Sequence, residues 1–186
     1  MSESTEQILD WIHEVENYQA TEWERLPEIY LYMDQVLTYM DKQLHLFERD
    51  EKTSLLTSSM VNNYVKDGVL PRPEQKKYSR DHLAMLTVIC MLKQVLSIPD
   101  ISFMMKSLLE NSAKSEMYER FRSAQASALK DVCERVETSA TSGEDSLQRL
   151  AIELAIEASA RRAAAERILS ELAKPGKEDP PKKEKK

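Results

Sequence analysis

The chain has 186 residues, a net charge of −6 and 41% hydrophobic residues, with only three glycines. This length is enough to bury a core in one domain or two small ones. No apolar run approaches the roughly 20 residues that cross a membrane, and the acidic start MSESTEQILD is unlike a signal peptide. Because helix-forming residues dominate and no alternation of period two appears, we expect a mostly α fold. Two cysteines within helical patterns favour a reduced, cytoplasmic protein.

Residues 1–25 are expected to form an N-terminal helical unit, with a helix from about Ser4 to Tyr18 that begins at a capping box of Ser4 and Gln7. Its apolar face comprises Ile8, Trp11, Ile12 and Val15. A break at Leu26-Pro27 then starts a second predicted helix, from Glu28 to about Phe47. The buried stripe of that helix comprises Ile29, Tyr32, Met33, Val36, Leu37, Met40 and Leu44. Residues 48–54, which are mostly charged, are expected to be a solvated connection.

The stretch from Thr57 to Leu83 is predicted to be a helix, a turn and the start of another helix. Thr57 is a good N-cap and Gly68 suits the left-handed residue that ends a helix, so the first helix covers about 57–67. Its apolar stripe comprises Val61, Tyr64 and Val65, and its polar face comprises Ser59, Asn62, Asn63 and Lys66. Such a face can contact base edges and phosphates in DNA, or it can be an ordinary solvated surface.

The segment 69–78 that follows is predicted to be extended and basic. Pro71 and Pro73 exclude a helix there. Arg72, Lys76, Lys77 and Tyr78 are candidates for contact with the phosphate backbone or the minor groove. Residues 52–82 contain six Lys or Arg and three Asp or Glu, so a locally basic surface lies on an acidic chain. Ser79 then caps a helix that is apolar almost all round and is therefore expected to lie at the centre of the core.

This pattern resembles known proteins. Gly68-Val69-Leu70-Pro71, Lys77-Tyr78-Ser79 and Leu83 are similar to the helix, wing and helix of MerR-type winged helix-turn-helix regulators. LPEIYLYMDQ, MVNNYVKDGVLPRPEQKKYSRDHLAML and LKQVLSIPDI resemble, over about Trp23 to Leu109, an uncharacterised bacterial domain-of-unknown-function family of MerR-like class. The resemblance implies a winged helix-turn-helix domain at 26–110, binding to double-stranded DNA, transcriptional control and a homodimer formed through C-terminal helices. MerR-type proteins often carry an Arg before paired tyrosines on the recognition helix. This chain departs from that pattern, because Asn62 and Asn63 precede Tyr64, which matches the second tyrosine.

Residues 111–173 are predicted to form a C-terminal helical region that dimerises. A short helix from Ser97 to about Leu109 precedes it, and its own helices cover about 114–136 and 144–173. The last helix carries a heptad seam that can pack within the chain or against a second copy. The seam comprises Leu147, Ala151, Leu154, Ala158, Arg161, Ala165, Ile168 and Leu172. The tail 174–186 is expected to be disordered and basic.

The sequence gives no sign of an enzyme, and we expect no cofactor and no metal site. It contains no GxGxxG, P-loop, HExxH or paired CxxC motif, and His13, His45 and His82 lie far apart. We expect His82 to be a surface or capping residue and Cys133 to be a core cysteine. The many methionines leave open a pocket for a small-molecule effector. The alternative function is a helical protein-protein interaction module with no specific DNA target.

Overall fold

The structure of the chain, a computed structural model, describes residues 2–48 and 54–174. Its helices are α1 (Glu3–Asn17), α2 (Met33–Leu44), α3 (Ser58–Lys66), α4 (Arg80–Leu92), α5 (Ile98–Asn111), α6 (Lys114–Thr141) and α7 (Glu144–Leu172), with 3₁₀ turns η1 (Trp23–Arg25) and η2 (His45–Phe47). The described ranges contain two isolated β-bridges and no longer strand. The mostly α fold is therefore confirmed, while the predicted connection at 48–54 and the tail fall largely outside the described residues.

Helix α4 lies at the centre of the larger of two hydrophobic clusters. Every residue from His82 to Cys90 is buried, as expected from its apolar composition on all sides. Residues of α2, α3, α5 and the first turns of α6 pack around it. These include Val36, Met40, Val61, Ile101 and Tyr118. Because α4 contributes buried side chains in every direction, it is the support on which the shorter helices are fixed.

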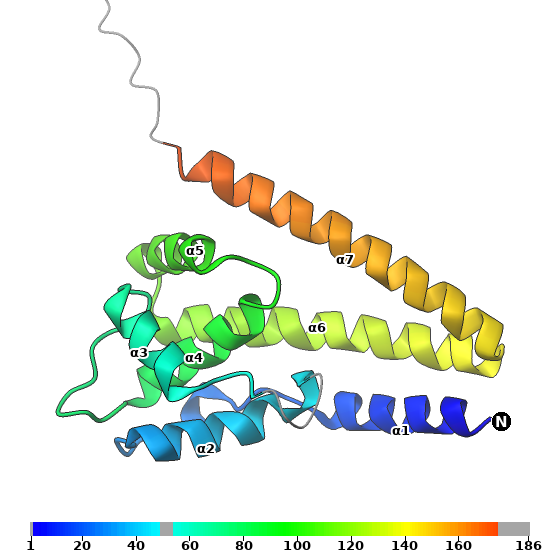
Figure 1. The fold of residues 1–186 in the computed structure, drawn as a ribbon, viewed down its shortest axis with the longest axis horizontal. Helices are drawn as coiled ribbons and strands as arrows, with labels where there is room; N and C mark the ends of the chain where they lie inside the picture. The colour runs from blue at the N-terminus through cyan, green and yellow to red at the C-terminus, as the bar shows by residue number, and fades with distance from the viewer. Residues whose placement is uncertain (1, 49–53, 175–186) are drawn as a thin grey trace, which may run out of the picture.

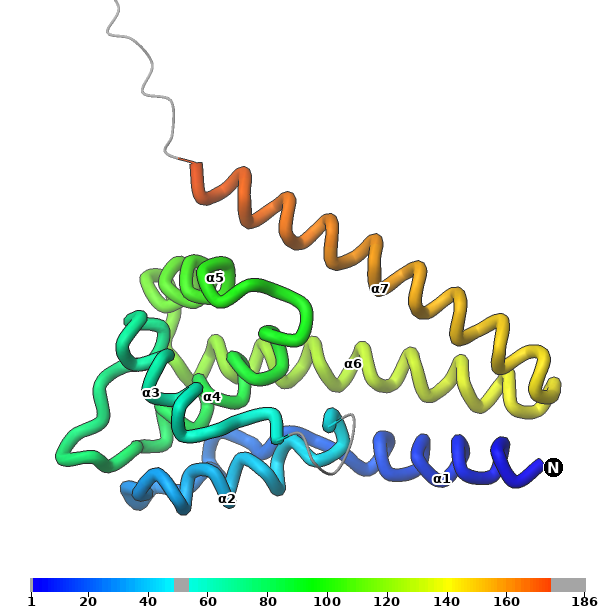
Figure 2. The backbone as a smooth tube through the Cα atoms, in the orientation of Figure 1, coloured from blue at the N-terminus to red at the C-terminus, as the bar shows by residue number. Residues whose placement is uncertain are grey.

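The second cluster joins α1 to the last turns of α6 and the first turns of α7. It contains Ile12 and Val15 of α1, Cys133 and Val136 of α6, and Leu150 of α7. Figure 1 shows α6 running the length of the molecule, with one end beside α4 and the other beside α1. In both ribbon and tube, the chain turns back between α6 and α7, and α7 diverges from α6 toward α5 (Figures 1 and 2). The longest helices thus connect the two clusters.

Both ends of the predicted second helix need correction. Helix α2 begins at Met33 rather than Glu28, because Leu31 pairs with Tyr78 through two backbone hydrogen bonds of 2.9 and 2.8 Å. The extended backbone that this pairing requires places Ile29 (70% exposed) and Tyr32 (52% exposed) at the surface instead of in the predicted stripe. At the other end, residues 45–47 form the 3₁₀ turn η2.

The first helix agrees with its predicted extent but differs in its cap and its apolar face. Ser2 is the N-cap, and its side chain accepts a hydrogen bond from the Thr5 amide, so Ser4 does not cap the helix. Trp11 is exposed, whereas Ile12 and Val15 are fully or almost fully buried. The apolar contact with α6 is narrower than the predicted stripe.

The C-terminal seam follows a different line of residues from the predicted heptads. Leu147, Leu154 and Ala165 do pack within the chain, but Leu150 and Leu169 join them while Ile168 and Leu172 are exposed. A bidentate pair between Arg135 of α6 and Glu157 of α7, at 2.8 and 3.0 Å, also fastens the two helices. Helix α6 continues to Thr141, past the predicted end at 136.

None of the helices in the described ranges has the length and apolar composition of a membrane span.

Candidate nucleic-acid interface

Helix α3 begins and ends at the residues that its sequence predicts. The Thr57 side chain accepts a hydrogen bond from the Met60 amide at 3.3 Å. Gly68 has a positive φ of 72°, which turns the chain so that the amides of Val69 and Leu70 donate to the Tyr64 carbonyl at 2.9 and 3.0 Å. These bonds satisfy the end of the helix and direct the next segment away from it.

The two faces of α3 are clearly separated. Val61 and Tyr64 are buried against the main cluster. The exposed face comprises Ser59, Asn62, Asn63 and Lys66, which are the polar residues predicted to contact DNA. They present hydroxyl, amide and ammonium groups, which together can donate to and accept from base edges.

Helix α3 is also fixed to α4 at its start. Lys93, the C-cap residue of α4, donates to the Leu55 carbonyl just before α3 and lies 3.4 Å from the Met60 sulfur. The Lys93 ammonium also satisfies a backbone group in the connection that leads into α3. The exposed face of α3 is therefore held in a defined orientation on the core.

Residues 69–78 form the loop between α3 and α4 that extends from one end of the molecule (Figure 1), and we call this segment the wing. Its tip is a tight turn in which the Lys77 amide donates to the Glu74 carbonyl at 2.8 Å. The two central residues, Gln75 and Lys76, have φ of 49° and 64°. Residues other than glycine rarely adopt this conformation, and pairs of it occur in hairpin turns. The turn leaves Lys76 exposed at the tip.

The base of the wing is attached to the segment before α2. Beyond the backbone pairing of Leu31 with Tyr78, the Lys77 ammonium lies 5.3 Å from the centre of the Tyr32 ring, a cation–π contact. Tyr32 was predicted to lie on the buried stripe of a helix, but it is the N-cap of α2 and a surface neighbour of the wing. The exposed Ile29 and Tyr30 lie in the same segment.

His82 fixes the wing to the first turn of α4. Its Nδ1 accepts from the Ser79 amide at 3.0 Å, and its Nε2 donates to the Pro71 carbonyl at 3.2 Å, an arrangement that fits the neutral imidazole. Burial lowers the pKa of His82, although the bond to Pro71 opposes that shift. The predicted capping role is confirmed, but the side chain is buried rather than on the surface.

Two predicted contact residues belong to the core. Tyr64 is 5% exposed and Tyr78 is 3% exposed, which corrects the expectation that their side chains face DNA. Burial raises the pKa of Tyr64 to about 12 and also raises that of Tyr78, so both phenols stay neutral. Their rings support α3 and the wing from inside. The remaining wing residues of the candidate set, Arg72 and Lys76, are exposed, and Lys77 is partly exposed.

A protein family covers this part of the chain. The family described as a domain of unknown function (DUF1836) matches residues 21–125, more than half of the sequence. The chain belongs to the DUF1836 family. No curated protein and no solved structure matches it.

The DUF1836 segment contains η1, α2, α3, the wing, α4, α5 and the first turns of α6. Every residue of the candidate interface therefore lies within the family domain. Helices α1 and α7 lie outside it, as does the end of α6 that packs against them. The second hydrophobic cluster is built entirely from residues that the family match does not cover.

An apolar cavity of about 260 Å³ lies within the DUF1836 domain, between α4, α5 and α6. Its lining includes Met104, Met105 and Met117 together with Leu92 and Phe121. Met105 and Met117 are buried in the main cluster, where flexible methionine side chains fill the irregular space between these helices.

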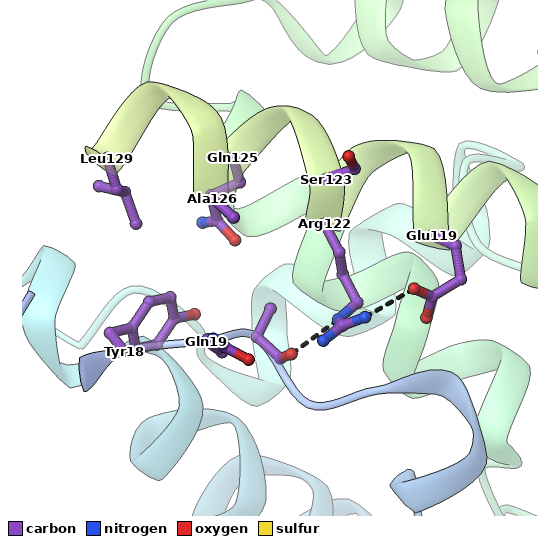
Figure 3. Close-up of a pocket in the computed structure, with 9 residues that line it drawn as sticks. Tyr18, Gln19, Glu119, Arg122, Ser123, Gln125, Ala126 and Leu129 are labelled. Atoms are coloured by element: carbon purple, nitrogen blue, oxygen red, sulfur yellow. Dashed lines mark hydrogen bonds and ion pairs between the residues drawn. The ribbon is translucent and has the colours of Figure 1, made fainter. Parts of the chain in front are cut away.

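A smaller cavity of about 170 Å³ lies between the segment after α1 and α6 (Figure 3). Arg122 extends across it and donates to the Ala20 carbonyl at 2.8 Å and to Glu119 at 2.6 Å. Nearby, the Tyr18 hydroxyl and the Gln125 side-chain nitrogen are buried and have no hydrogen-bond partner among the described residues. Burial, with a smaller effect of Tyr39, raises the pKa of Tyr18 to about 12. The polar side chains that line this cavity could form hydrogen bonds with buried water molecules.

Proposed function

We propose that the chain is a DNA-binding transcriptional regulator of the MerR-like winged helix-turn-helix type. The observation that carries this proposal is the direct succession of an exposed Ser-Asn-Lys helix face and an exposed basic wing, both fastened to α4. Helix α3 corresponds to the recognition helix, and residues 69–78 correspond to the wing. The resemblance of the motif to MerR-type regulators supports the same function.

The exposed residues divide into two roles in this proposal. Ser59, Asn62, Asn63 and Lys66 enter the major groove, where an Asn amide can pair with adenine through two hydrogen bonds. Arg72, Lys76 and Lys77 hold the phosphate backbone, which positions the protein without reading sequence. Tyr64 and Tyr78 maintain the shape of the two elements from within the core.

A selection of labelled genomic duplexes by the full chain tests the proposal. We expect enrichment of one sequence above nonspecific binding at low salt. In that duplex, Asn63→Ala should lower discrimination by about 1–3 kcal/mol, because one base loses its paired amide. Lys76→Ala should weaken binding to all sequences and reduce the salt slope by about 0.9, the effect of one phosphate contact.

The matched control is Lys130→Ala. Lys130 is an exposed lysine of α6 that lines a cavity formed with the end of α1, so its loss should leave the salt slope unchanged. If no duplex exceeds nonspecific binding, the proposed function is wrong. Equal salt slopes for Lys76→Ala and Lys130→Ala would remove the wing from the interface.

The alternative is a protein-protein interaction module, and one observation favours it. Ile29, Tyr30 and Tyr32 form an exposed apolar segment beside the wing. Aromatic residues at a surface are typical of protein interfaces. Failure of the duplex selection, together with capture of a purified partner that Tyr30→Ala abolishes, would support this alternative.

A further inference from the structure

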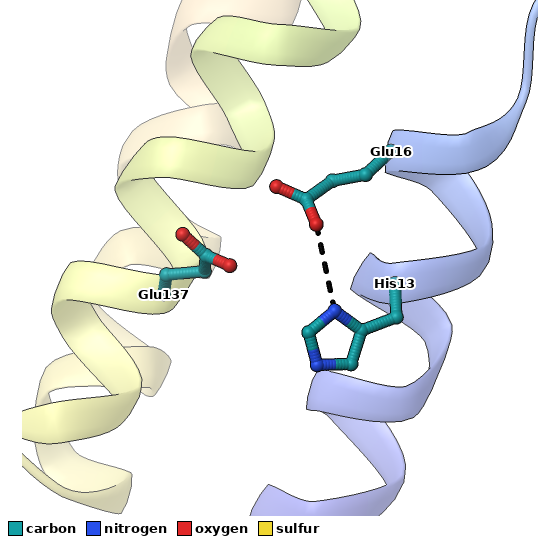
Figure 4. Close-up of side chains that lie close together, drawn as sticks. All are labelled: His13, Glu16 and Glu137. Carbon is teal, nitrogen blue, oxygen red and sulfur yellow. Dashed lines mark hydrogen bonds and ion pairs between the residues drawn. The ribbon is translucent and has the colours of Figure 1, made fainter.

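Two side chains of α1 meet a third from α6, which is distant from them in sequence (Figure 4). His13 and Glu16 are three residues apart on α1, so they share one face of that helix. Glu137 extends toward them from α6. One candidate ligand atom from each residue lies within 4.8 Å of the other two.

From this cluster we infer a binding site for a divalent transition-metal ion of the Zn²⁺ type, held by His13, Glu16 and Glu137. One imidazole nitrogen and two carboxylate oxygens form a ligand set that zinc and its neighbours accept. Three protein ligands leave a coordination position for water.

The spacing of the first two ligands agrees with this inference. The His13 Nδ1 and Glu16 Oε2 atoms are 3.4 Å apart, which is long for a hydrogen bond. Two ligands about 2.1 Å from a tetrahedral zinc ion stand roughly 3.4 Å from one another. Glu137 is half-buried, and its candidate ligand atom lies within 4.8 Å of those of His13 and Glu16.

The charges around the cluster favour a cation as well. Within the described ranges, neither Glu16 nor Glu137 forms an ion pair with a lysine or arginine. Two carboxylates therefore face each other at a helix interface, where like charges repel. A divalent ion removes this repulsion and links α1 to α6.

The test uses tag-free full-length protein, stripped with a chelator, and ZnCl₂ or CoCl₂ alone as the probe. We expect saturable zinc binding of one ion per chain by calorimetry, an increase in Tm, and a visible absorption band with cobalt. His13→Ala and Glu137→Gln should each weaken binding by more than about tenfold, since even changes beside a ligand cost about 10–100-fold.

Two controls keep the result specific. His45→Ala removes another exposed histidine, and Glu134→Gln removes another exposed carboxylate of α6. Both should bind zinc as the wild type does, and circular dichroism should show all four variants folded. The inference is overturned if the wild type does not bind zinc, or if the double variant His13→Ala/Glu137→Gln binds it with unchanged affinity.

Discussion

At the scale of single residues, His82 determines how the wing is held. Its ring bridges the Ser79 amide and the Pro71 carbonyl and packs edge-on against Tyr78 at 5.4 Å between ring centres. Only the neutral ring can accept at Nδ1 and donate at Nε2. Protonation of Nδ1 would turn this acceptor into a donor that faces the Ser79 amide, so their hydrogen bond would be lost.

This arrangement makes stability depend on pH. Burial lowers the folded-state pKa of His82, helped by Lys114 and opposed by the bond to Pro71 and by Asp81. The unfolded chain therefore binds the proton first, with an ordinary pKa near about 6.5. The contribution of His82 should be full above that pH and decline as the pH falls from about 6.5 toward the lower folded pKa.

Urea unfolding at pH 7.5 and 5.5 measures the effect. The wild type should lose more stability on acidification than His82→Gln, because glutamine also serves at the third position of a capping box but does not titrate. The same loss in both proteins would show that another group controls the acid response.

The residue-scale features of α3 were predictable because capping is local. The Thr57 side chain caps the start of the helix, and Gly68 adopts the positive φ that ends it. The spacing of polar and apolar residues by three or four positions defines the exposed face. The burial of Tyr78 and the exposure of Tyr32 were not predictable, because both follow from the pairing of Leu31 with Tyr78. The proximity of His13, Glu16 and Glu137 was not predictable for the same reason, since Glu137 meets His13 only in the folded chain.

At the scale of helices, Leu150 is the main contact by which α7 completes the second cluster. It is the one residue of α7 classed as buried among those described, with 5% of its surface exposed, and its neighbours include residues of α1 and α6. The cluster around α4 does not include it. The two clusters should therefore respond differently to its loss.

Leu150→Ala should lower the free energy of unfolding by about 2–5 kcal/mol, the cost of a cavity left by a buried leucine. Hydrogen exchange should accelerate in α1, the end of α6 and α7, while α4 keeps its protection. The control Gln148→Ala changes an exposed polar residue of the same helix and should cost no more than about 0.5 kcal/mol. Uniform acceleration throughout the chain would contradict the division into two clusters.

The helix-scale prediction for the C-terminal seam was only partly correct, for a geometric reason. A straight helix of 3.6 residues per turn drifts away from a strict heptad line, and α7 packs first on α6 and then near α5. Leu150 and Leu169 replace Ala151 and Ile168 as the packed residues. Which line of residues is used depends on the path of the partner helix, which the sequence of α7 does not encode.

At the scale of the whole molecule, α7 presents an apolar surface that residues 2–48 and 54–174 leave exposed. Ile152 and Ile156 are one turn apart and both exposed, and Ile168 and Leu172 repeat the arrangement farther along. Exposed apolar residues in a row are typical of protein interfaces. The homodimer expected from the MerR-like resemblance remains a prediction, and this surface is where we place it.

Sedimentation of the full chain should therefore give a dimer. The double variant Ile152→Asp/Ile156→Asp should give a folded monomer, because two carboxylates cannot be buried unpaired in the interface. Arg162→Asp, at another exposed position of α7, should leave the dimer intact. A wild-type monomer at high concentration would remove α7 from the proposed dimer interface.

The pairing of Leu31 with Tyr78 also has a consequence for the order in which the chain folds. It joins two segments on either side of α2 and α3, so both helices lie within the loop that it closes. Closing a long loop costs conformational entropy, which is offset only by the contacts that form once the loop is closed. We infer that α2 and α3 assemble on α4 first, and that the base of the wing closes last and opens first.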